Sequence, residues 1–160
     1  MSERWLNDNE TVAWRTYIET AGDLSTALEK DLMCHGLTLG DYQVLVYLSE
    51  SGDHAMRMCD LADSLQLSPS GLTRRLDGLV ASGYVTRRPS EVDRRVMMAV
   101  LTDAGYDLLA STAPHHVRSV RRHLLDPLDQ QQICVLADIF ESSADGLRPE
   151  TGCGDDTEAV

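Results

Sequence analysis

The feature that most constrains this chain is a sharply capped helix followed at once by two extended runs. Ser68 and Pro69 form the helix start, with Ser as the N-cap and Pro at the first helical position. Apolar residues at helical spacing continue from there, and Gly83 then ends the helix. The β-prone runs 84–88 and 95–101 flank a polar loop and predict a hairpin.

A shorter helix precedes the capped helix. The apolar residues Leu61, Ala62 and Leu65 predict that it covers about residues 58–66. The connection between the two helices is therefore a tight turn. A helix, a tight turn and a capped helix make a helix-turn-helix, and the hairpin that follows has the place of a wing.

Helical periodicity covers most of the remaining chain. It predicts helices over about residues 9–35, 38–49, 103–123 and 126–144, the last of them opening at Asp126-Pro127. A very short strand is expected near residues 54–57. The predicted fold class is mostly α (α+β), a winged helix-turn-helix with helices on both sides of it.

The flanking helices carry apolar faces that one small domain does not cover. We therefore expect a two-fold homodimer built from these helices, with an intramolecular bundle as the alternative. The expected organisation is an N-terminal dimerisation helix (1–36), a winged helix-turn-helix DNA-binding domain (37–102), C-terminal dimerisation helices (103–145) and a disordered acidic tail (146–160).

Charge is unevenly distributed along the chain, whose net charge is −12. Between Ser70 and Arg95, six Arg stand against three acidic residues, so this segment carries +3 and the rest carries −15. An acidic body repels DNA in general, whereas a basic patch engages phosphates. On charge alone, a solvated Arg-rich surface is an equally good interpretation.

Several classes of protein are disfavoured. Apolar runs stay well short of the roughly 18 residues of a membrane span, and the N-terminus lacks the apolar core of a signal peptide, so we expect a cytoplasmic protein with no membrane partner. The four cysteines, Cys34, Cys59, Cys134 and Cys153, are too scattered for a zinc site or a disulfide framework. Without a phosphate-binding Gly loop or a nucleophile–base pattern, we expect neither an enzyme nor a cofactor.

The capped helix has two stripes. Leu72, Leu76, Leu79 and Val80 have the spacing of a buried stripe, and Ser70, Thr73, Arg74 and Asp77 fall opposite them. The N-terminal residues of a recognition helix contact base edges, and Arg can bind guanine through two hydrogen bonds. Asp77 is expected to orient Arg74 or Arg75. The predicted DNA-binding residues are Ser68, Ser70, Thr73, Arg74, Arg75, Arg87, Arg88, Asp93, Arg94 and Arg95.

The hairpin loop carries its own charged residues. Asp93 and Arg95 are two residues apart, so on a strand they would share a face and could form an ion pair. Arg94 would then point elsewhere, towards phosphate or the minor groove. In isolation, an ordinary surface ion pair is the simpler interpretation.

The order of these residues identifies a family resemblance. Leu72-Thr73-Arg74 is followed by Asp93, Arg95 and Leu101-Thr102, which fit the signature D-x-R-x5-L-T. Over roughly residues 9–145 the chain closely resembles the MarR family of dimeric winged helix-turn-helix transcription factors. The resemblance implies homodimers on pseudo-palindromic operators in double-stranded DNA, mostly as repressors, with recognition helices in successive major grooves and wings at the minor groove.

Two positions depart from the family pattern. Val96 stands where the family usually has Gly after the signature Arg, so the wing tip is expected to differ in shape. Gly78 stands where a basic residue is common, so one phosphate contact is expected to be missing. Gly78 lies inside a helix, where close packing against a neighbouring element is the expected reason for a glycine.

The resemblance also implies a possible effector, because many members release DNA when a small aromatic or phenolic anion binds between the helical region and the winged domain. The candidates for such a pocket are Trp14, Tyr17, His35, Tyr42 and Tyr47, with Arg15 or Arg57 as a cationic anchor. Core or dimer-interface roles are the more economical interpretation of these residues.

Other hypotheses remain open at this point. The acidic net charge and Gly78 suit a winged-helix module that binds protein instead of DNA. A cysteine-based redox-sensing regulator is another alternative, and Cys59, near a helix N-terminus, is its best-placed thiol. His115, His116 and His123 could bind a metal, but a helix surface explains them more simply.

Overall fold

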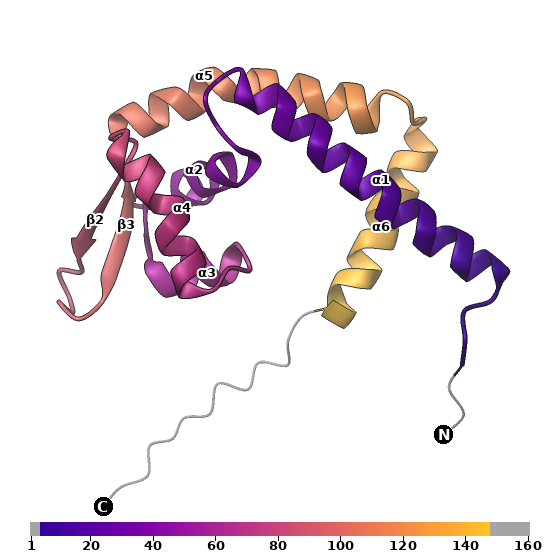
Figure 1. Ribbon diagram of the computed structural model, residues 1–160, viewed down its shortest axis with the longest axis horizontal. Coiled ribbons are helices and arrows are strands. Elements are labelled where there is room, and N and C mark those ends of the chain that lie inside the picture. Colours follow the sequence, from indigo (N-terminus) through magenta and orange to yellow (C-terminus); the bar gives the residue numbers. More distant parts are fainter. Residues whose placement is uncertain (1–3, 148–160) are drawn as a thin grey trace, which may run out of the picture.

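The computed structural model describes residues 4–147 of the chain (Figure 1). Its elements, in order, are α1 (Asp8–Met33), α2 (Leu39–Glu50), β1 (Ala55–Arg57), α3 (Met58–Ser64), α4 (Pro69–Ala81), β2 (Val85–Pro89), β3 (Met97–Leu101), α5 (Asp103–Val120), the π-helical segment η1 (Arg121–Leu125) and α6 (Gln130–Leu147). The expected winged helix-turn-helix is confirmed: α3 and α4 form the helix-turn-helix, and β2 and β3 form the wing.

The strands form one antiparallel sheet with the order β1-β3-β2. β3 pairs Val100 with Ala55 of β1, and it pairs Leu101 with Val85 of β2. Ala99 and Leu101 alternate with more exposed neighbours, so one face of β3 is buried. The sheet thereby closes one side of the core of the winged domain.

The core of the winged domain is aliphatic. Its largest fully buried side chains come from α2, α3, α4 and β2: Val44, Leu45, Leu48, Leu61, Leu72, Leu76 and Val85. Burial of a side chain of this size contributes about 1.5–3 kcal/mol relative to exposure. This packing fixes which face of α4 is left outside.

Gly83 turns the chain from α4 into the sheet. Its φ is +76°, the left-handed region in which glycine has no steric penalty. The amide of Tyr84 donates to Leu79 O at 2.9 Å, and the amide of Gly83 donates to Val80 O at 3.0 Å, so carbonyls at the helix end are satisfied. The predicted stop at Gly83 is confirmed.

Outside the winged domain, α1 packs along α5. After η1 the chain turns into α6, which crosses behind the N-terminal half of α1 in Figure 1, where Phe140 lies near Tyr17. The predicted start of the last helix at Asp126-Pro127 is wrong. Asp126 accepts a hydrogen bond from Arg121 at 2.9 Å instead of capping the helix. The cap of α6 is Asp129, whose carboxylate accepts the amide of Gln132 at 2.8 Å while the Gln132 side chain accepts the amide of Asp129.

The start of β3 and the end of α6 also differ from the sequence prediction. β3 begins at Met97, two residues later than expected, because the amide of Val96 donates to Asp93 O and continues the turn. Residues 146 and 147, expected to open the tail, belong to α6. The rest of the predicted acidic tail, residues 148–160, lies outside the described residues. Within the described range, no helix combines the length and apolarity that a bilayer crossing requires.

Two helical glycines give a paired test of packing. A Cβ at Gly105 would overlap Tyr84 O and lie 2.8 Å from Leu101 Cδ1, whereas a Cβ at Gly78 would meet nothing within 4 Å. Close packing is therefore the wrong explanation for Gly78. We expect Gly105→Ala to lower stability by about 1–3 kcal/mol through overpacking, and Gly78→Ala to raise it by about 0.5–1 kcal/mol. Urea unfolding followed by circular dichroism measures both, and equal effects of the two substitutions would contradict the packing described here.

Candidate nucleic-acid interface

The local sequence of α4 determines its exposed face. Ser68 Oγ accepts the amide of Gly71 at 3.1 Å and caps the helix, as predicted. Leu72 and Leu76 are buried, so the positions between and opposite them face outward. The outward residues near the start of the helix are Ser70, Thr73, Arg74 and Asp77.

Two hydroxyls on this face have short-range partners. Thr73 Oγ1 donates to Pro69 O within the helix at 2.9 Å, and Ser70 Oγ lies 3.2 Å from Ser68 Oγ. Each hydroxyl oxygen can still accept or share a hydrogen bond. Arg74 is exposed, and its guanidinium has no hydrogen bond or ion pair with the described part of the chain.

Arg87 of β2 binds α4 rather than projecting to solvent. One guanidinium nitrogen donates to Thr73 O at 2.8 Å and to Asp77 Oδ1 at 2.9 Å. Its side chain is only 26% exposed. The expectation that Asp77 orients Arg74 or Arg75 is wrong, because the strand beside the helix supplies a closer cation. The Arg87 side chain thus connects the wing to the recognition helix.

Arg75 is also engaged within the protein. Its Nη1 donates to Thr38 Oγ1 at 3.1 Å and lies 3.6 Å from Asp41 Oδ1, at the start of α2. Arg88 pairs with Glu91 at 2.9 Å within the hairpin. Of the predicted DNA-binding cations, these two and Arg87 therefore have protein partners.

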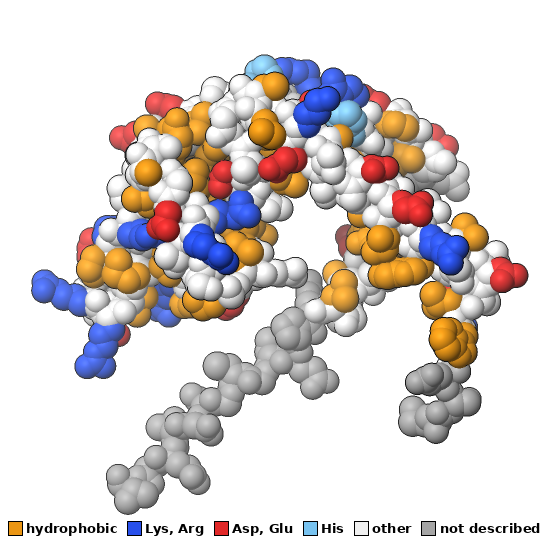
Figure 2. Space-filling model, viewed as in Figure 1, with side chains coloured by type: hydrophobic (Ala, Val, Ile, Leu, Met, Phe, Trp, Pro, Cys, Tyr) orange, Lys and Arg blue, Asp and Glu red, His pale blue; other side chains and the backbone are white. Residues whose placement is uncertain are grey.

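The tip of the wing has two free cations. Asp93 Oδ1 accepts the backbone amide of Arg95 at 2.9 Å, so the predicted ion pair between the two side chains is wrong. The same-face argument fails because residues 93–96 form a turn and not a strand. Arg94 and Arg95 are exposed and, among the described residues, their guanidinium groups have no partner. Figure 2 shows basic side chains projecting from the far end of the β2–β3 hairpin, at the lower left.

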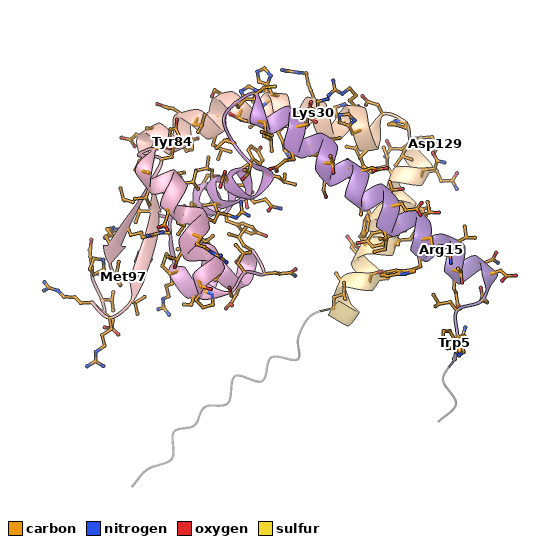
Figure 3. The ribbon with its side chains drawn as sticks, viewed as in Figure 1. Trp5, Arg15, Lys30, Tyr84, Met97 and Asp129 are labelled. Atoms are coloured by element: carbon orange, nitrogen blue, oxygen red, sulfur yellow. The ribbon has the colours of Figure 1, made fainter. Side chains whose placement is uncertain are left out.

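The candidate effector residues fall into two groups. Trp14 and Tyr17 lie on the N-terminal half of α1, with ring centroids 6.2 Å apart, and Tyr17 lies 6.4 Å from Phe140 of α6. Arg15 lies on the same half of α1, far from the winged domain (Figure 3). Trp14 and the end of α1 are separated by about 30 Å of helix at 1.5 Å per residue.

The second group surrounds His116 of α5. Tyr42 and Tyr47 line a cavity of about 400 Å³ between α1, α2 and α5, which His116 also lines. His35 lines a neighbouring cavity of about 620 Å³ that shares His116. Neither cavity is lined by Trp14, Arg15 or Tyr17. The hypothesis of a single pocket containing all six residues is therefore wrong, since a long helix separates the two groups.

His116 and Tyr42 pack against each other at this junction, with ring centroids 4.3 Å apart and the ring planes tilted by 43°. Burial lowers the pKa of His116 and raises the pKa of Tyr42, so both rings favour the neutral form. His35 and His115 lie 4.5 Å apart by centroid, and the pKa of His115 is lowered by desolvation and by the nearby Arg118 and His35.

A polar cluster that the sequence did not indicate joins α1 to the end of α5. Asp31 Oδ2 accepts Ser119 Oγ at 2.5 Å and Arg122 Nη2 at 2.6 Å, and it lies 3.2 Å from His123 Nε2. The hydrogen bond from Ser119, with those from His123 and Arg122, holds the pKa of Asp31 below its ordinary value against the opposing effect of desolvation. In the sequence, this cluster could be inferred only from the i, i+3, i+4 spacing of Ser119, Arg122 and His123, which places them on one helix face.

The cysteines of the described residues do not form a disulfide or a metal site. Cys34, Cys59 and Cys134 are exposed free thiols, and Cys153 lies outside the described residues. Cys59 Sγ lies 3.3 Å from the carboxylate of Asp60. Across residues 4–147, no three His, Cys, Asp or Glu side chains are placed to hold a metal ion.

Comparison with known proteins gives consistent matches. The MarR family model matches residues 35–96. AbsC, a MarR family transcriptional regulator from Streptomyces coelicolor, is 42% identical over 92% of this chain and 100% of its own, with a TM-score of 0.87. Sco3205, a MarR family regulator from the same organism solved in complex with DNA, is 37% identical over 93% of this chain and 94% of its own, with a TM-score of 0.88. The HTH-type transcriptional regulator PecS of Dickeya dadantii is 30% identical over 110 residues, which are 68% of this chain and 66% of PecS.

The Asp31 cluster predicts a specific dependence of stability on pH. Because the pKa of Asp31 is lower in the folded state, its contribution is present above the ordinary aspartate pKa of about 3.9 and is lost as pH falls through the lowered value. We expect Asp31→Asn to lower the melting temperature at pH 7 and the difference from the original protein to shrink at acidic pH. Asp53→Asn, at an exposed residue of a turn, is the control. A constant difference between Asp31→Asn and the original protein from pH 7 to pH 3 would contradict this role.

Proposed function

The chain belongs to the MarR family of transcriptional regulators, and on that premise we propose that it is a homodimeric repressor that binds a pseudo-palindromic DNA operator. The observation that carries the proposal is the division among the arginines of the winged domain. Arg74 on α4 and Arg94 and Arg95 on the wing have no partner among the described residues. Unpaired guanidinium groups on an exposed helix and a hairpin tip suit contacts with base edges and phosphates.

The roles of the three arginines follow from their positions. Arg74 lies in the second turn of α4, where a recognition helix contacts bases in the major groove. Arg94 and Arg95 lie at the wing tip, where a hairpin contacts the backbone and the minor groove. Ser70 and Thr73 add hydroxyls beside Arg74. Asp93 shapes the turn that presents Arg95 rather than contacting DNA itself.

Exposed apolar side chains on α1 and α6 support the homodimer. Tyr17 and Ile18 of α1 are 50% and 48% exposed, and Ile139 and Phe140 of α6 are 54% and 48% exposed. The described part of α6 contains no buried side chain. An apolar helix face left in water favours association with a second copy, and a two-fold axis would supply the two half-site contacts of a pseudo-palindrome.

We further propose that a small aromatic effector binds the cavity lined by Tyr42, Tyr47 and His116. The cavity also has the aliphatic side chains of Leu28 and Val46 in its wall, so an aromatic ring would find apolar and stacking contacts. Glu50 is its only charged lining residue. A neutral phenol therefore suits this cavity better than the aromatic or phenolic anion expected from the family resemblance.

The proposed DNA binding predicts a steep dependence on salt. The two wing arginines in each of two protomers could neutralise about four phosphates, which gives a slope of log K against log salt on the order of −4. Fluorescence anisotropy of the purified protein with the DNA upstream of its own coding sequence, and with a scrambled duplex, measures it. Weak binding to both duplexes at every salt concentration would favour the alternative of a protein-interaction module.

Two substitutions extend the same measurement. Arg74→Ala is expected to cost about 1–3 kcal/mol on the preferred sequence and to relax the preference over the scrambled duplex. Arg94→Ala is expected to weaken binding to both duplexes alike and to reduce the slope by about two, one for each protomer. An equal loss of sequence preference from both substitutions would refute this division of roles.

The proposed dimer predicts that a charge on the exposed face of α6 separates the protomers. Phe140→Glu removes two apolar rings per dimer and places two carboxylates in the interface, a loss of about 3 kcal/mol or more. Sedimentation velocity should then show monomers at concentrations where the original protein is dimeric. Val92→Glu, at a residue 98% exposed on the wing, is the control and should leave the dimer intact. A dimeric Phe140→Glu protein would exclude this interface.

A further inference from the structure

The first turn of α2 is a junction between three helices. Its own capping box is complete: Thr38 Oγ1 accepts the amide of Asp41 at 3.0 Å, and Asp41 Oδ2 accepts the amide of Thr38 at 3.1 Å. From α1, the carboxylate of Glu29 accepts the amide of Leu39 at 2.5 Å. The start of α2 is therefore hydrogen-bonded to the end of α1.

Arg75 contacts the same turn from the recognition helix. Its Nη1 donates to the capping hydroxyl of Thr38 at 3.1 Å and lies 3.6 Å from Asp41 Oδ1. The Arg75 side chain is 32% exposed, and so about two thirds of it is covered. Thr38 and Asp41 therefore bind both the backbone at the start of α2 and the guanidinium of Arg75.

Gly40 provides the space for this contact. A Cβ at Gly40 would overlap the guanidinium of Arg75, including Nη1 and Cζ. The planar group lies against bare backbone of the first turn of α2, and a Cβ at position 40 would require the guanidinium to move from this place. The arrangement depends on two residues that are 35 positions apart in the sequence.

The electrostatics of the helix N-terminus show that Arg75 is held by specific side chains of α2. A cation at a helix N-terminus is disfavoured by the helix dipole, so the site does not attract an arginine through the dipole. The carboxylate of Asp41 and the hydroxyl of Thr38 offset that effect through directed contacts. A guanidinium already held in this way is poorly available to a phosphate.

We propose that Arg75 is a positioning residue for DNA recognition, which fixes α4 against the start of α2 and so against α1. The inference rests on the proposed function, because α1 belongs to the proposed dimer interface. It replaces the sequence-based prediction that Arg75 contacts DNA. Through Glu29 and Thr38, the angle of each recognition helix is tied to the dimer arm, and that angle determines the spacing of the two helices on an operator, roughly 34 Å for one DNA turn.

The test uses duplexes enriched from a random-sequence library by the original protein. Anisotropy across a salt series compares the original protein with Arg75→Ala and with Arg94→Ala, the matched arginine that has no protein partner. Arg94→Ala is expected to reduce the salt slope by about two. Arg75→Ala is expected to weaken binding on the order of threefold to tenfold with the slope unchanged. A reduced slope for Arg75→Ala, equal to that of Arg94→Ala, would overturn the proposal.

A second variant disturbs the contact without changing any charge. Gly40→Ala should displace the guanidinium and weaken binding as much as Arg75→Ala does. In the Arg75→Ala background, the same Gly40→Ala change should have no further effect, because the three atoms nearest to that Cβ all belong to the Arg75 guanidinium. Equal losses from Gly40→Ala in both backgrounds would show that Gly40 acts independently of Arg75 and would contradict the proposal.

The dependence of binding on the spacing of the two half-sites distinguishes a positioning role of Arg75 from a general loss of protein stability. One base pair inserted between the half-sites should penalise the original protein strongly and Arg75→Ala less, because the variant holds α4 less firmly. Arg75→Lys keeps the charge without the planar group and should recover part of the spacing preference. Unchanged spacing preference in Arg75→Ala would overturn the inference alone. Failure of the original protein to enrich any duplex would instead overturn the proposed function, and the role of Arg75 with it.

Discussion

Burial of one apolar stripe on α4 determines how the rest of the winged domain is arranged. Leu72 and Leu76 are 1% and 0% exposed, beneath α2 and the sheet. With 3.6 residues per turn, that burial leaves Thr73 and Arg74 facing outward at the start of the helix. The face available to DNA is thus a consequence of core packing. A rotation of α4 about its axis would expose Leu72 and Leu76 and bury Arg74. The packing of the core therefore determines which face of α4 is available to DNA.

The arginines of this domain serve two different purposes. Arg75 and Arg87 contact α2 and α4 and hold the recognition helix from opposite sides, through Thr38 on one side and Asp77 on the other. Arg74, Arg94 and Arg95 have no such partner within residues 4–147. This division explains how a chain with net charge −12 could bind DNA. The basic groups are few, but Arg75 and Arg87 hold the recognition helix in place before DNA binds, which lowers the entropic cost of binding.

Local signals predicted most of the fold, and non-local contacts account for what they missed. The cap at Ser68 and the stop at Gly83 depend on neighbouring residues, so the boundaries of α4 were predictable. The partner of Asp77 is on a strand ten residues away, and helical spacing alone does not identify it. Asp126 followed by Pro127 resembles a helix cap, but the Asp126 carboxylate binds Arg121 instead. Arg121 belongs to a π-helical segment that the apolar periodicity did not indicate. The sequence predicted a concentration of arginines in the winged domain, but not which of them are free and which are engaged by the protein.

Two carboxylates in the last turns of α1 connect this helix to the start of α2 and to the end of α5. Glu29 binds the amide of Leu39 at the start of α2, and Asp31 binds Ser119 and Arg122 near the end of α5. The cavity lined by Tyr42 and His116 lies between the same three helices. An effector there need not touch α4 to act on it: a small separation of α1 from α2 would be transmitted through Thr38 to Arg75. Because packed helices shift as units rather than deform continuously, a ligand at this junction would change the angle of α4 as a whole.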